Sequence, residues 1–427
     1  MTWSVREMKA YQLAQLRRIV DRAYRRVPYY RRSFDAADVQ PADVATLADI
    51  QRLPPIDKTV VRNHHADFIA GDADPDGLSY MTTGGSAGDP LKIMMDDRFK
   101  GLNHANTWFY LWTVGYEPET HPSVRLHGNT IDQDLVDRGQ YWVEEGLRLT
   151  MSVYHIDQDT TPAFVERINA HRPEYIHAYP SALSLLCHYI DILGLEVIDT
   201  VQWAFIDSET IFPWQRALIE RVLNCRTFSI YGHTEGAGLA FTCKECGMMR
   251  VAPLVGLMEV LDPDGTQVKE SGGTGEIVVT GFNNDVFPLI RYRTGDLATL
   301  APESNCLACN NAGMRFSEVK GRIQDYVVNR NGARTAIAPA LFDYNFDWSH
   351  IDRFQIYQDT PGVLLFRIVA ARDAVGQEEA LKRRVIESFG AILNRQFEID
   401  AEIVNDIPHT ARGKYRYVDQ RLEITDD

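Results

Sequence analysis

The sequence has few cysteines, no long apolar run and no cluster of positive charge. Six cysteines in 427 residues are too few for a disulfide scaffold. No stretch approaches the roughly 18 consecutive apolar residues that a membrane span needs. The first six residues do not have the charged-then-apolar arrangement of a signal peptide. These absences predict a cytoplasmic protein without a membrane partner.

Basic segments are absent as well. The sequence has 44 Lys and Arg against 59 Asp and Glu, which gives a net charge of −15, and no run of Lys and Arg offsets this excess of acid. Because binding a polyanion normally requires a basic patch, the composition argues against a nucleic-acid partner. Low-complexity segments and internal repeats are also absent. A chain of this length with 45% hydrophobic residues therefore predicts two or three ordinary globular domains.

Strand-like and helical segments alternate between about residues 97 and 230. We expect strands at 124–126, 149–153, 175–178, 201–206 and 226–230, and helices at 97–114, 134–147, 161–171, 180–193 and 213–223. Strands separated by helices indicate βαβ units and a parallel sheet. Ligands of such sheets bind beyond the carboxyl ends of the strands. The candidate segments are therefore His177–Ser181, Asp207–Thr210 and Tyr231–Gly236.

The regions on either side of this alternation have different patterns. Residues 1–58 predict a helical module, and short alternating strands from about 250 to 300 predict a small antiparallel barrel or sheet. The tail predicts a small α+β domain, with helices at 338–345 and 375–395 and strands at 352–358, 363–370 and 400–404. We expect one domain over 1–322, whose β-rich part spans about 240–320, and a second over 323–427.

The stretch Tyr80–Pro90 contains two threonines, three glycines and a serine within seven residues. Its glycines tolerate positive φ, so backbone amides can converge on one phosphate while the hydroxyls add donors. The residues concerned are Gly84, Gly85 and Gly88, with Thr82, Thr83 and Ser86. The stretch alone is equally compatible with an ordinary glycine-rich surface turn. It is no Walker loop, because Lys92 stands four residues after Gly88.

Four of the six cysteines form two Cys-x-x-Cys pairs, Cys243 with Cys246 and Cys306 with Cys309. Two such pairs supply the four thiolates of a tetrahedral zinc site. Because four ligands leave no open coordination position, a zinc ion held there would be structural. Four unligated thiols are the alternative interpretation.

Several separated motifs together have the order and spacing of one family. They are Tyr80–Pro90, Tyr231–Glu235, Tyr292–Asp296, Gly321–Arg322 and Thr410–Lys414, joined by Val27–Tyr30 and Leu53–Lys58 near the N-terminus. On these residues the chain resembles the adenylate-forming ligases, and within them the short branch that contains phenylacetate-CoA ligase and its capsule-biosynthesis relatives. The resemblance implies an α/β fold. It would consist of a large N-terminal domain with parallel sheets and a small β-barrel-like subdomain, and a small mobile α+β C-terminal domain.

The resemblance also implies a reaction. A carboxylic acid would be joined to ATP to give an acyl-adenylate and pyrophosphate, and the acyl group would then pass to CoA. An amine, a sugar or a carrier thiol is the alternative acceptor, because no separate CoA signature is present. A zinc-stabilised binding protein without catalysis is the alternative from another class. The N-terminal helices offer a surface for a homodimer.

The resemblance assigns roles to single residues. Glu235 would bind Mg²⁺, a hard cation that takes carboxylate and phosphate oxygens, and Thr234 would contact the α-phosphate. Lys414 would bridge the substrate carboxylate and the α-phosphate. Asp296 would accept the ribose hydroxyls, and Arg322 would meet the ribose or the phosphates.

Further residues would complete the nucleotide site. Thr82, Thr83, Gly84, Gly85 and Ser86 would hold the pyrophosphate end, with Gly88 in the same loop, and Tyr231, Gly232 and Glu209 are expected beside the nucleotide. By residue type alone, Asp296 could equally cap a turn, Arg322 form a surface salt bridge and Lys414 be a solvated lysine. The chain departs from the family at Gln324, where the hinge aspartate is usual, and at Asp207–Thr210, where glycines usually precede the glutamate.

Overall fold

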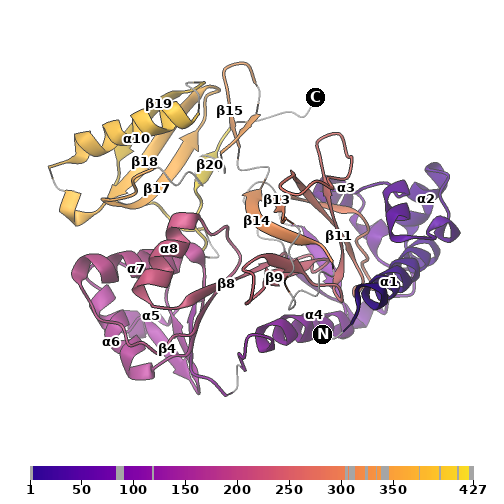
Figure 1. Cartoon of the computed structure of the whole chain (residues 1–427), viewed down its shortest axis with the longest axis horizontal. Helices are drawn as coiled ribbons and strands as arrows, with labels where there is room; N and C mark the ends of the chain where they lie inside the picture. The colour runs from indigo at the N-terminus through magenta and orange to yellow at the C-terminus, as the bar shows by residue number, and fades with distance from the viewer. Residues whose placement is uncertain are drawn as a thin grey trace. The chain divides into compact units, whose positions relative to one another are not determined.

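The computed structural model describes residues 3–82, 91–117, 120–302, 306, 313–322, 326–332, 334–337, 346–374, 376–393, 396–410 and 413–422. The chain divides into two compact units (Figure 1). Unit 1 comprises Met1–Glu117 and Phe228–Lys320, and unit 2 comprises Pro118–Thr227 and Gly321–Asp427. Each unit is therefore built from two stretches that are distant in the sequence. From the sequence we expect a boundary after residue 322, between a large domain and a mobile C-terminal domain. That boundary stays a prediction.

Unit 1 begins with the predicted helical module. Helix α1 (Val5–Arg26) starts at a capping box in which Ser4 and Glu7 exchange hydrogen bonds, and Pro28 opens α2 (Pro28–Ala36). Proline cannot continue a helix but suits its first turn, so the break at Val27 follows from the sequence. Four 3₁₀ turns (Pro41–Asp43, Leu47–Arg52, His65–Phe68 and Pro75–Gly77) and α3 (Lys58–Asn63) follow. Helix α4 spans Asp97–Trp112.

The sheet of unit 1 is antiparallel and has the order β11-β12-β13-β14-β10-β9-β8. Its strands are β8 (Arg226–Gly232), β9 (Leu239–Thr242), β10 (Met249–Val251), β11 (Gly256–Leu261), β12 (Thr274–Gly281), β13 (Tyr292–Leu300) and β14 (Arg315–Arg322). Strand β14 lies between β13 and β10, and its pairing with β10 extends the sheet past β13 within the described residues. The barrel predicted for this region is therefore not confirmed. A separate hairpin pairs β1 (Ser79–Thr82) with β2 (Lys92–Met95).

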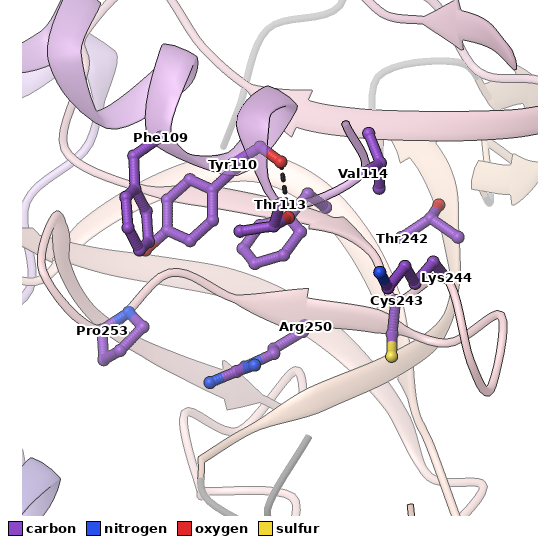
Figure 2. Close-up of a pocket in the computed structure, with 10 residues that line it drawn as sticks. Phe109, Tyr110, Thr113, Val114, Thr242, Cys243, Lys244, Arg250 and Pro253 are labelled. Atoms are coloured by element: carbon purple, nitrogen blue, oxygen red, sulfur yellow. Dashed lines mark hydrogen bonds between the residues drawn. The ribbon is translucent and has the colours of Figure 1, made fainter. Parts of the chain in front are cut away.

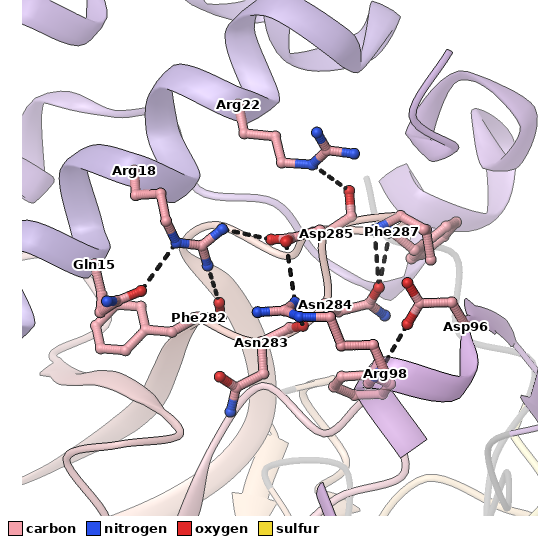
Figure 3. Close-up of polar contacts among 12 residues, drawn as sticks. Gln15, Arg18, Arg22, Asp96, Arg98, Phe282, Asn283, Asn284, Asp285 and Phe287 are labelled. Carbon is pink, nitrogen blue, oxygen red and sulfur yellow. Dashed lines mark hydrogen bonds and ion pairs between the residues drawn. The ribbon is translucent and has the colours of Figure 1, made fainter. Parts of the chain in front are cut away.

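A polar network attaches the N-terminal helices to this sheet (Figure 3). Asp285 lies in the turn after β12 and pairs with Arg18 of α1 at 2.6 Å and with Arg98 of α4 at 3.0 Å. The Arg22 side chain donates to the backbone oxygen of the same aspartate at 2.8 Å. One carboxylate therefore joins two helices that are distant in the sequence.

Unit 2 contains the predicted parallel sheet, in the order β7-β6-β3-β5-β4. Its strands are β3 (Ser123–Leu126), β4 (Trp142–Glu145), β5 (Arg148–Met151), β6 (Tyr175–Ala178) and β7 (Trp203–Ile206), of which only β4 runs antiparallel. The accompanying helices are α5 (Gln133–Val136), α6 (Thr161–His171), α7 (Pro180–Leu193) and α8 (Pro213–Val222). Apolar side chains of these strands and helices form one buried cluster.

The helix predicted for 134–147 is wrong. Only Gln133–Val136 is helical, and the rest of the segment forms a turn and strand β4, which pairs with β5 in a hairpin. Gly139 and Gly146 both have positive φ, at 76° and 58°. Glycine adopts this conformation readily, so the chain turns at both positions, where a helix would need negative φ.

The C-terminal part of unit 2 is a four-stranded sheet of order β19-β18-β17-β20 with α10 packed on it (Figure 1). The elements are β17 (Ile351–Gln358), β18 (Val363–Ala370), α10 (Glu378–Ile392), β19 (Glu398–Ile403) and β20 (Val418–Gln420). A small hairpin of β15 (Tyr326–Val328) and β16 (Arg334–Ala336) precedes them, and a 3₁₀ turn lies at Arg372–Ala374. The strands and the helix predicted for this tail are thus found. The helix predicted for 338–345 lies outside the described residues.

Hydrogen bonds join this C-terminal part to the parallel-sheet part. Asp352 of β17 accepts from His188 at 2.7 Å and from the Tyr189 hydroxyl at 2.6 Å, both on α7. The Tyr417 hydroxyl accepts from Gln215 of α8 at 2.8 Å. Of the helices that the structure describes, none combines the length and the apolar character required to cross a bilayer.

Candidate functional site

The last residues of β8 and the turn that follows carry Tyr231–Glu235, and the turn ends at Gly236. Gly236 has φ of 64°, and a Cβ atom there would lie 2.6 Å from the ring of Phe99. This backbone conformation would strain any L side chain, and the contact would force the Phe99 ring to move. The glycine therefore allows the turn to fold back against α4 and holds Thr234 and Glu235 in a tight loop.

Glu235 is largely enclosed, with 10% of its side chain exposed, and both of its carboxylate oxygens are hydrogen-bonded. The Tyr292 hydroxyl donates to Oε1 at 2.8 Å, and His233 Nδ1 lies 3.2 Å from Oε2. Burial alone would raise the pKa of Glu235, but the hydrogen bond and charge of His233 and the Tyr292 hydroxyl outweigh it and lower this pKa to about 2. The side chain is therefore a carboxylate at neutral pH, the form that coordinates a hard divalent cation.

Asp296 is held by the same group of aromatic residues. The Tyr231 hydroxyl donates to Asp296 Oδ2 at 2.8 Å, and the Asp296 backbone N–H donates to Thr294 at 3.1 Å. The register between β12 and β13 shifts between Glu276 and Val278, and Glu276 accepts from the Gly295 backbone at 3.1 Å. Such irregularities re-aim side chains. The structure thus brings together Tyr231, Gly232, Thr234, Glu235 and Asp296, which come from two motifs.

The predicted phosphate loop is described only at its ends. Thr82 is the last residue of β1 and pairs with Lys92 of β2, so the loop connects the two strands of a hairpin. Thr83, Gly84, Gly85, Ser86 and Gly88 lie outside the described residues. Their predicted roles stay predictions.

Unit 2 brings Lys414 to the loop after β7. Lys414 Nζ donates to the backbone oxygen of Ser208 at 3.1 Å and lies 6.0 Å from the centre of the Tyr179 ring. Glu209 accepts from the backbone N–H of Tyr415 at 2.8 Å and of Ser181 at 3.2 Å. Burial raises the pKa of Glu209. Two predicted residues that are distant in the sequence, Glu209 and Lys414, thus belong to one set of contacts.

Gly413 allows the turn before Lys414 to pack closely against Gly128 and Tyr154. It has φ of 71°, and a Cβ atom there would lie 2.7 Å from Gly128 Cα and 2.9 Å from the Tyr154 hydroxyl. The Gly413 backbone N–H donates to Thr410 at 2.8 Å, which closes a turn before the lysine. Arg322 is the last residue of β14, its side chain is not described, and Gln324 lies outside the described residues.

Three of the four predicted zinc ligands lie together in unit 1. Cys243 Sγ and Cys306 Sγ are 3.9 Å apart, and with Cys246 all three sulfur atoms lie within 4.8 Å of one another. Two thiolates on a tetrahedral zinc ion lie about 3.8 Å apart, because a Zn–S bond is about 2.3 Å long. The spacing of the sulfur atoms therefore fits the ion. Cys309 lies outside the described residues.

A pocket of about 150 Å³ borders this cysteine cluster (Figure 2). Aromatic side chains of α4 form one wall, where the Tyr110 ring stacks on Phe241 with 3.9 Å between the ring centres. The pocket is lined by Phe109, Tyr110, Thr113, Val114, Phe241, Thr242, Cys243, Lys244, Arg250 and Pro253.

Sequence reasoning missed a cluster of His127, His177 and Asp207 in unit 2. Their ligand atoms lie within 4.8 Å of one another, and His177 Nε2 is 2.7 Å from Asp207 Oδ2. Burial lowers the pKa of His127 to about 3, so this side chain is neutral at neutral pH. The signal was present, because each residue lies at or just after the carboxyl end of a strand, and β3, β6 and β7 are neighbours in the sheet.

Comparisons with known proteins give the chain relatives over most of its length. Residues 334–421 match the model of the CapK C-terminal domain. A phenylacetate-coenzyme A ligase of Thermus thermophilus is 27% identical over 340 residues, which cover 76% of this chain and 72% of the relative. Protein CapK of Staphylococcus aureus is 26% identical over 384 residues, which cover 87% and 80% of the two chains.

A solved structure shows the same fold. The crystal structure of 2-hydroxyisobutyryl-CoA ligase in the postadenylation state, in complex with 2-HIB-AMP, matches with a TM-score of 0.76 at 16% identity and covers 98% of this chain and 91% of the other. The predicted α/β fold with a separate C-terminal domain is thereby confirmed. Over most of its length the chain is thus similar to proteins named phenylacetate-coenzyme A ligase and CapK, and it has the fold of an acyl-CoA ligase of known structure.

Proposed function

We propose that the protein activates a carboxylic acid with ATP, releases pyrophosphate, and transfers the acyl group from the acyl-adenylate to CoA. The observation that carries the proposal is that each of the two motifs holds the other's carboxylate: the Tyr292 hydroxyl donates to Glu235 and the Tyr231 hydroxyl donates to Asp296, at 2.8 Å each. Relatives named phenylacetate-coenzyme A ligase support the same reaction.

The charge of each site residue suggests a different role in the reaction. Glu235 is suited to hold Mg²⁺, which would neutralise charge that develops on the phosphates, and Thr234 would donate to the α-phosphate. Asp296 would accept the ribose hydroxyls, and Arg322 would contact the ribose or the phosphates. We assign the pyrophosphate to Thr82–Gly88, and the nucleotide base to the neighbourhood of Tyr231, Gly232 and Glu209.

Lys414 would stabilise the negative charge shared by the acid and the α-phosphate during adenylation. The glycine turn that precedes it and its contact with the Ser208 backbone oxygen keep the ammonium group in a fixed position. A donor fixed before the reaction needs no reorganisation in the transition state. The lysine therefore contributes to the first half-reaction, and we expect the small domain to move for the second.

The first experiment measures acid-dependent ATP–pyrophosphate exchange across a panel of carboxylic acids. Replacing Lys414 with Met should lower exchange on the order of 100-fold, the cost of one transition-state donor. The matched control is Lys382→Ala, a surface lysine on α10 that pairs with Glu379, and it should leave exchange unchanged. Unchanged exchange in the Lys414 variant would contradict the role of this lysine, and no exchange with any acid in the native protein would favour a zinc-stabilised binding protein without catalysis.

A second experiment identifies the acceptor. With an acid that supports exchange, CoA should be converted to a thioester that is detected by mass spectrometry. Exchange without thioester would replace CoA with an amine, a sugar or a carrier thiol as acceptor. Glu235→Gln should weaken the dependence of exchange on Mg²⁺, whereas Glu270→Gln, at an exposed turn, should not.

We further propose a structural zinc ion on Cys243, Cys246, Cys306 and Cys309. The 3.9 Å spacing of Cys243 and Cys306 supports it, and reduced thiols suit the cytoplasm as the location. Purified protein should contain at least one zinc per chain, and Cys243→Ser should lower both the zinc content and the melting temperature. Zinc-free native protein with an unchanged melting temperature would refute this site.

The N-terminal helices are a proposed homodimer surface. Sedimentation measurements at several protein concentrations would show whether a dimer forms. A monomer at every concentration would exclude the dimer.

A further inference from the structure

The cluster of His127, His177 and Asp207 is built unlike an ordinary hydrogen-bonded histidine–aspartate pair. Asp207 Oδ2 lies 2.7 Å from His177 Nε2, as expected of a hydrogen bond. The other oxygen, Asp207 Oδ1, faces His127 Nε2 at 3.6 Å, which is too long for a hydrogen bond. Both of these atoms are buried, and neither has a hydrogen-bond partner among the described residues.

Leaving two buried polar atoms unpaired is unfavourable. A buried polar atom without a partner loses its hydrogen bonds to water and gains none in the protein, and His127 is only 7% exposed. The ring of His127 also stacks on Tyr179, with 4.6 Å between the ring centres and 5° between the planes, so it is packed in this orientation. The structure therefore keeps the unpaired nitrogen directed at the unpaired carboxylate oxygen.

A second histidine–aspartate pair in the same unit shows the contrast. His188 lies 2.7 Å from one oxygen of Asp352, and the Tyr189 hydroxyl donates to the other at 2.6 Å. Both carboxylate oxygens of Asp352 thus have partners, and no second imidazole is present in the pair. The His188 pair needs nothing further, whereas the His127 cluster lacks one component.

We propose that His127, His177 and Asp207 bind a divalent transition-metal ion, with Zn²⁺ as the best fit. Two imidazoles and one carboxylate are ligands typical of zinc and its neighbours, whereas Mg²⁺ and Ca²⁺ prefer oxygen ligands alone. Two such atoms on one tetrahedral zinc ion lie roughly 3.4 Å apart, since the bonds are about 2.0–2.1 Å long. The 3.6 Å between His127 and Asp207 is close to this value.

Three protein ligands leave one coordination position open. Zinc sites of this kind usually hold water or substrate in the fourth position, unlike closed structural sites. Two neutral imidazoles and one carboxylate also leave the bound ion with a net positive charge, which favours an anionic donor such as a carboxylate there. This site is distinct from the cysteine cluster of unit 1, whose ligands are all thiolates.

Cobalt titration of the full-length protein tests the proposal, because the two kinds of site differ in colour. After measurement of the zinc already bound, Co²⁺ alone is added and the absorption spectrum recorded. We expect one equivalent to produce visible d–d bands without the sulfur-to-metal charge-transfer band that marks cobalt on thiolates. These bands should be lost in His127→Gln, His177→Gln and Asp207→Asn, and Zn²⁺ should displace the cobalt in the native protein.

The matched control is His188→Gln, which removes a histidine from the satisfied pair and should leave cobalt binding unchanged. A crystal of the native protein grown with Co²⁺ provides a measurement that does not depend on any variant folding. An anomalous peak between His127 Nε2 and Asp207 Oδ1 would support the site. Absence of that peak, absence of the bands in native protein, or bands that persist in the His127→Gln/His177→Gln double variant would overturn it. None of these readouts depends on adenylation.

Discussion

The hydroxyl of Tyr231 donates a 2.8 Å hydrogen bond to Asp296 Oδ2 and so joins two motifs that are 65 residues apart. Tyr231 is itself buried, and burial raises the pKa of its hydroxyl, so it acts only as a neutral donor. Because it lies near the end of β8 and donates to Asp296 of β13, it is a positioning residue for the proposed ribose contact.

Tyr231→Phe should therefore have a larger effect on nucleotide binding than on the stability of the fold. Asp296 would lose a fixed donor, which costs about 1 kcal/mol of stability, and we expect the KM for ATP to rise about tenfold with a smaller change in kcat. Steady-state exchange kinetics measure both. Tyr24→Phe removes a hydroxyl that donates at 2.8 Å to Asp35 on the surface, and should change neither constant. An unchanged KM in Tyr231→Phe would contradict the positioning role.

Gly413→Ala should move the Lys414 turn out of place. The added methyl would lie 2.7 Å from Gly128 Cα, a backbone atom that cannot move aside alone, and the positive φ adds about 1 kcal/mol of strain. Exchange activity should fall at least tenfold, and the tail should become more sensitive to limited proteolysis. Gly139→Ala has a similar φ of 76° with no atom within 4 Å, so it should cost only the strain and keep full activity. Equal effects of the two variants would contradict the close-approach explanation.

Asp285→Ala should loosen the N-terminal helices. The carboxylate pairs with both Arg18 and Arg98 and its side chain is 23% exposed, so we expect a loss of about 1–2 kcal/mol in the free energy of unfolding. Asp97 pairs with Lys100 but its side chain is 91% exposed, so Asp97→Ala should leave the free energy of unfolding almost unchanged. Urea denaturation measures both. Losses of the same size in the two variants would show that the Asp285 network adds no more to the free energy of unfolding than an exposed ion pair does.

The region around His409 should weaken in mild acid. Burial lowers the pKa of His409, and nearby Arg353 lowers it further, while Asp406 opposes both. A histidine whose pKa is lowered in the folded state gives its full stability above its ordinary pKa of about 6.5, and stability is lost as the pH falls below that value. His409→Gln does not titrate, so its free energy of unfolding should fall less than that of the native protein between about pH 7.5 and about pH 5.5. Parallel pH dependence of the two proteins would rule out this role for His409.

Local sequence determined much of the architecture. Alternating periodicities predicted the parallel strands of unit 2 and the strands of the tail, and Pro28 predicted the break between α1 and α2, because these features depend on neighbouring residues. The same reasoning failed at 134–147. There, the pairing of β4 with β5 and the turns at Gly139 and Gly146 stabilise a strand instead of a helix. The spacing of the apolar residues alone predicts a helix and contains no information on this pairing.

The sequence by itself determined which motifs the chain carries, and the tertiary structure decided which of their side chains meet. Residue type and order indicated Glu235, Asp296 and Lys414 as candidates. Only the folded sheet showed that tyrosine hydroxyls hold the two carboxylates, that Glu209 binds the Tyr415 backbone, and that three neighbouring strands bring His127, His177 and Asp207 together. Contacts of this kind join residues far apart in the chain, and their geometry depends on strand order and register, which no local pattern specifies.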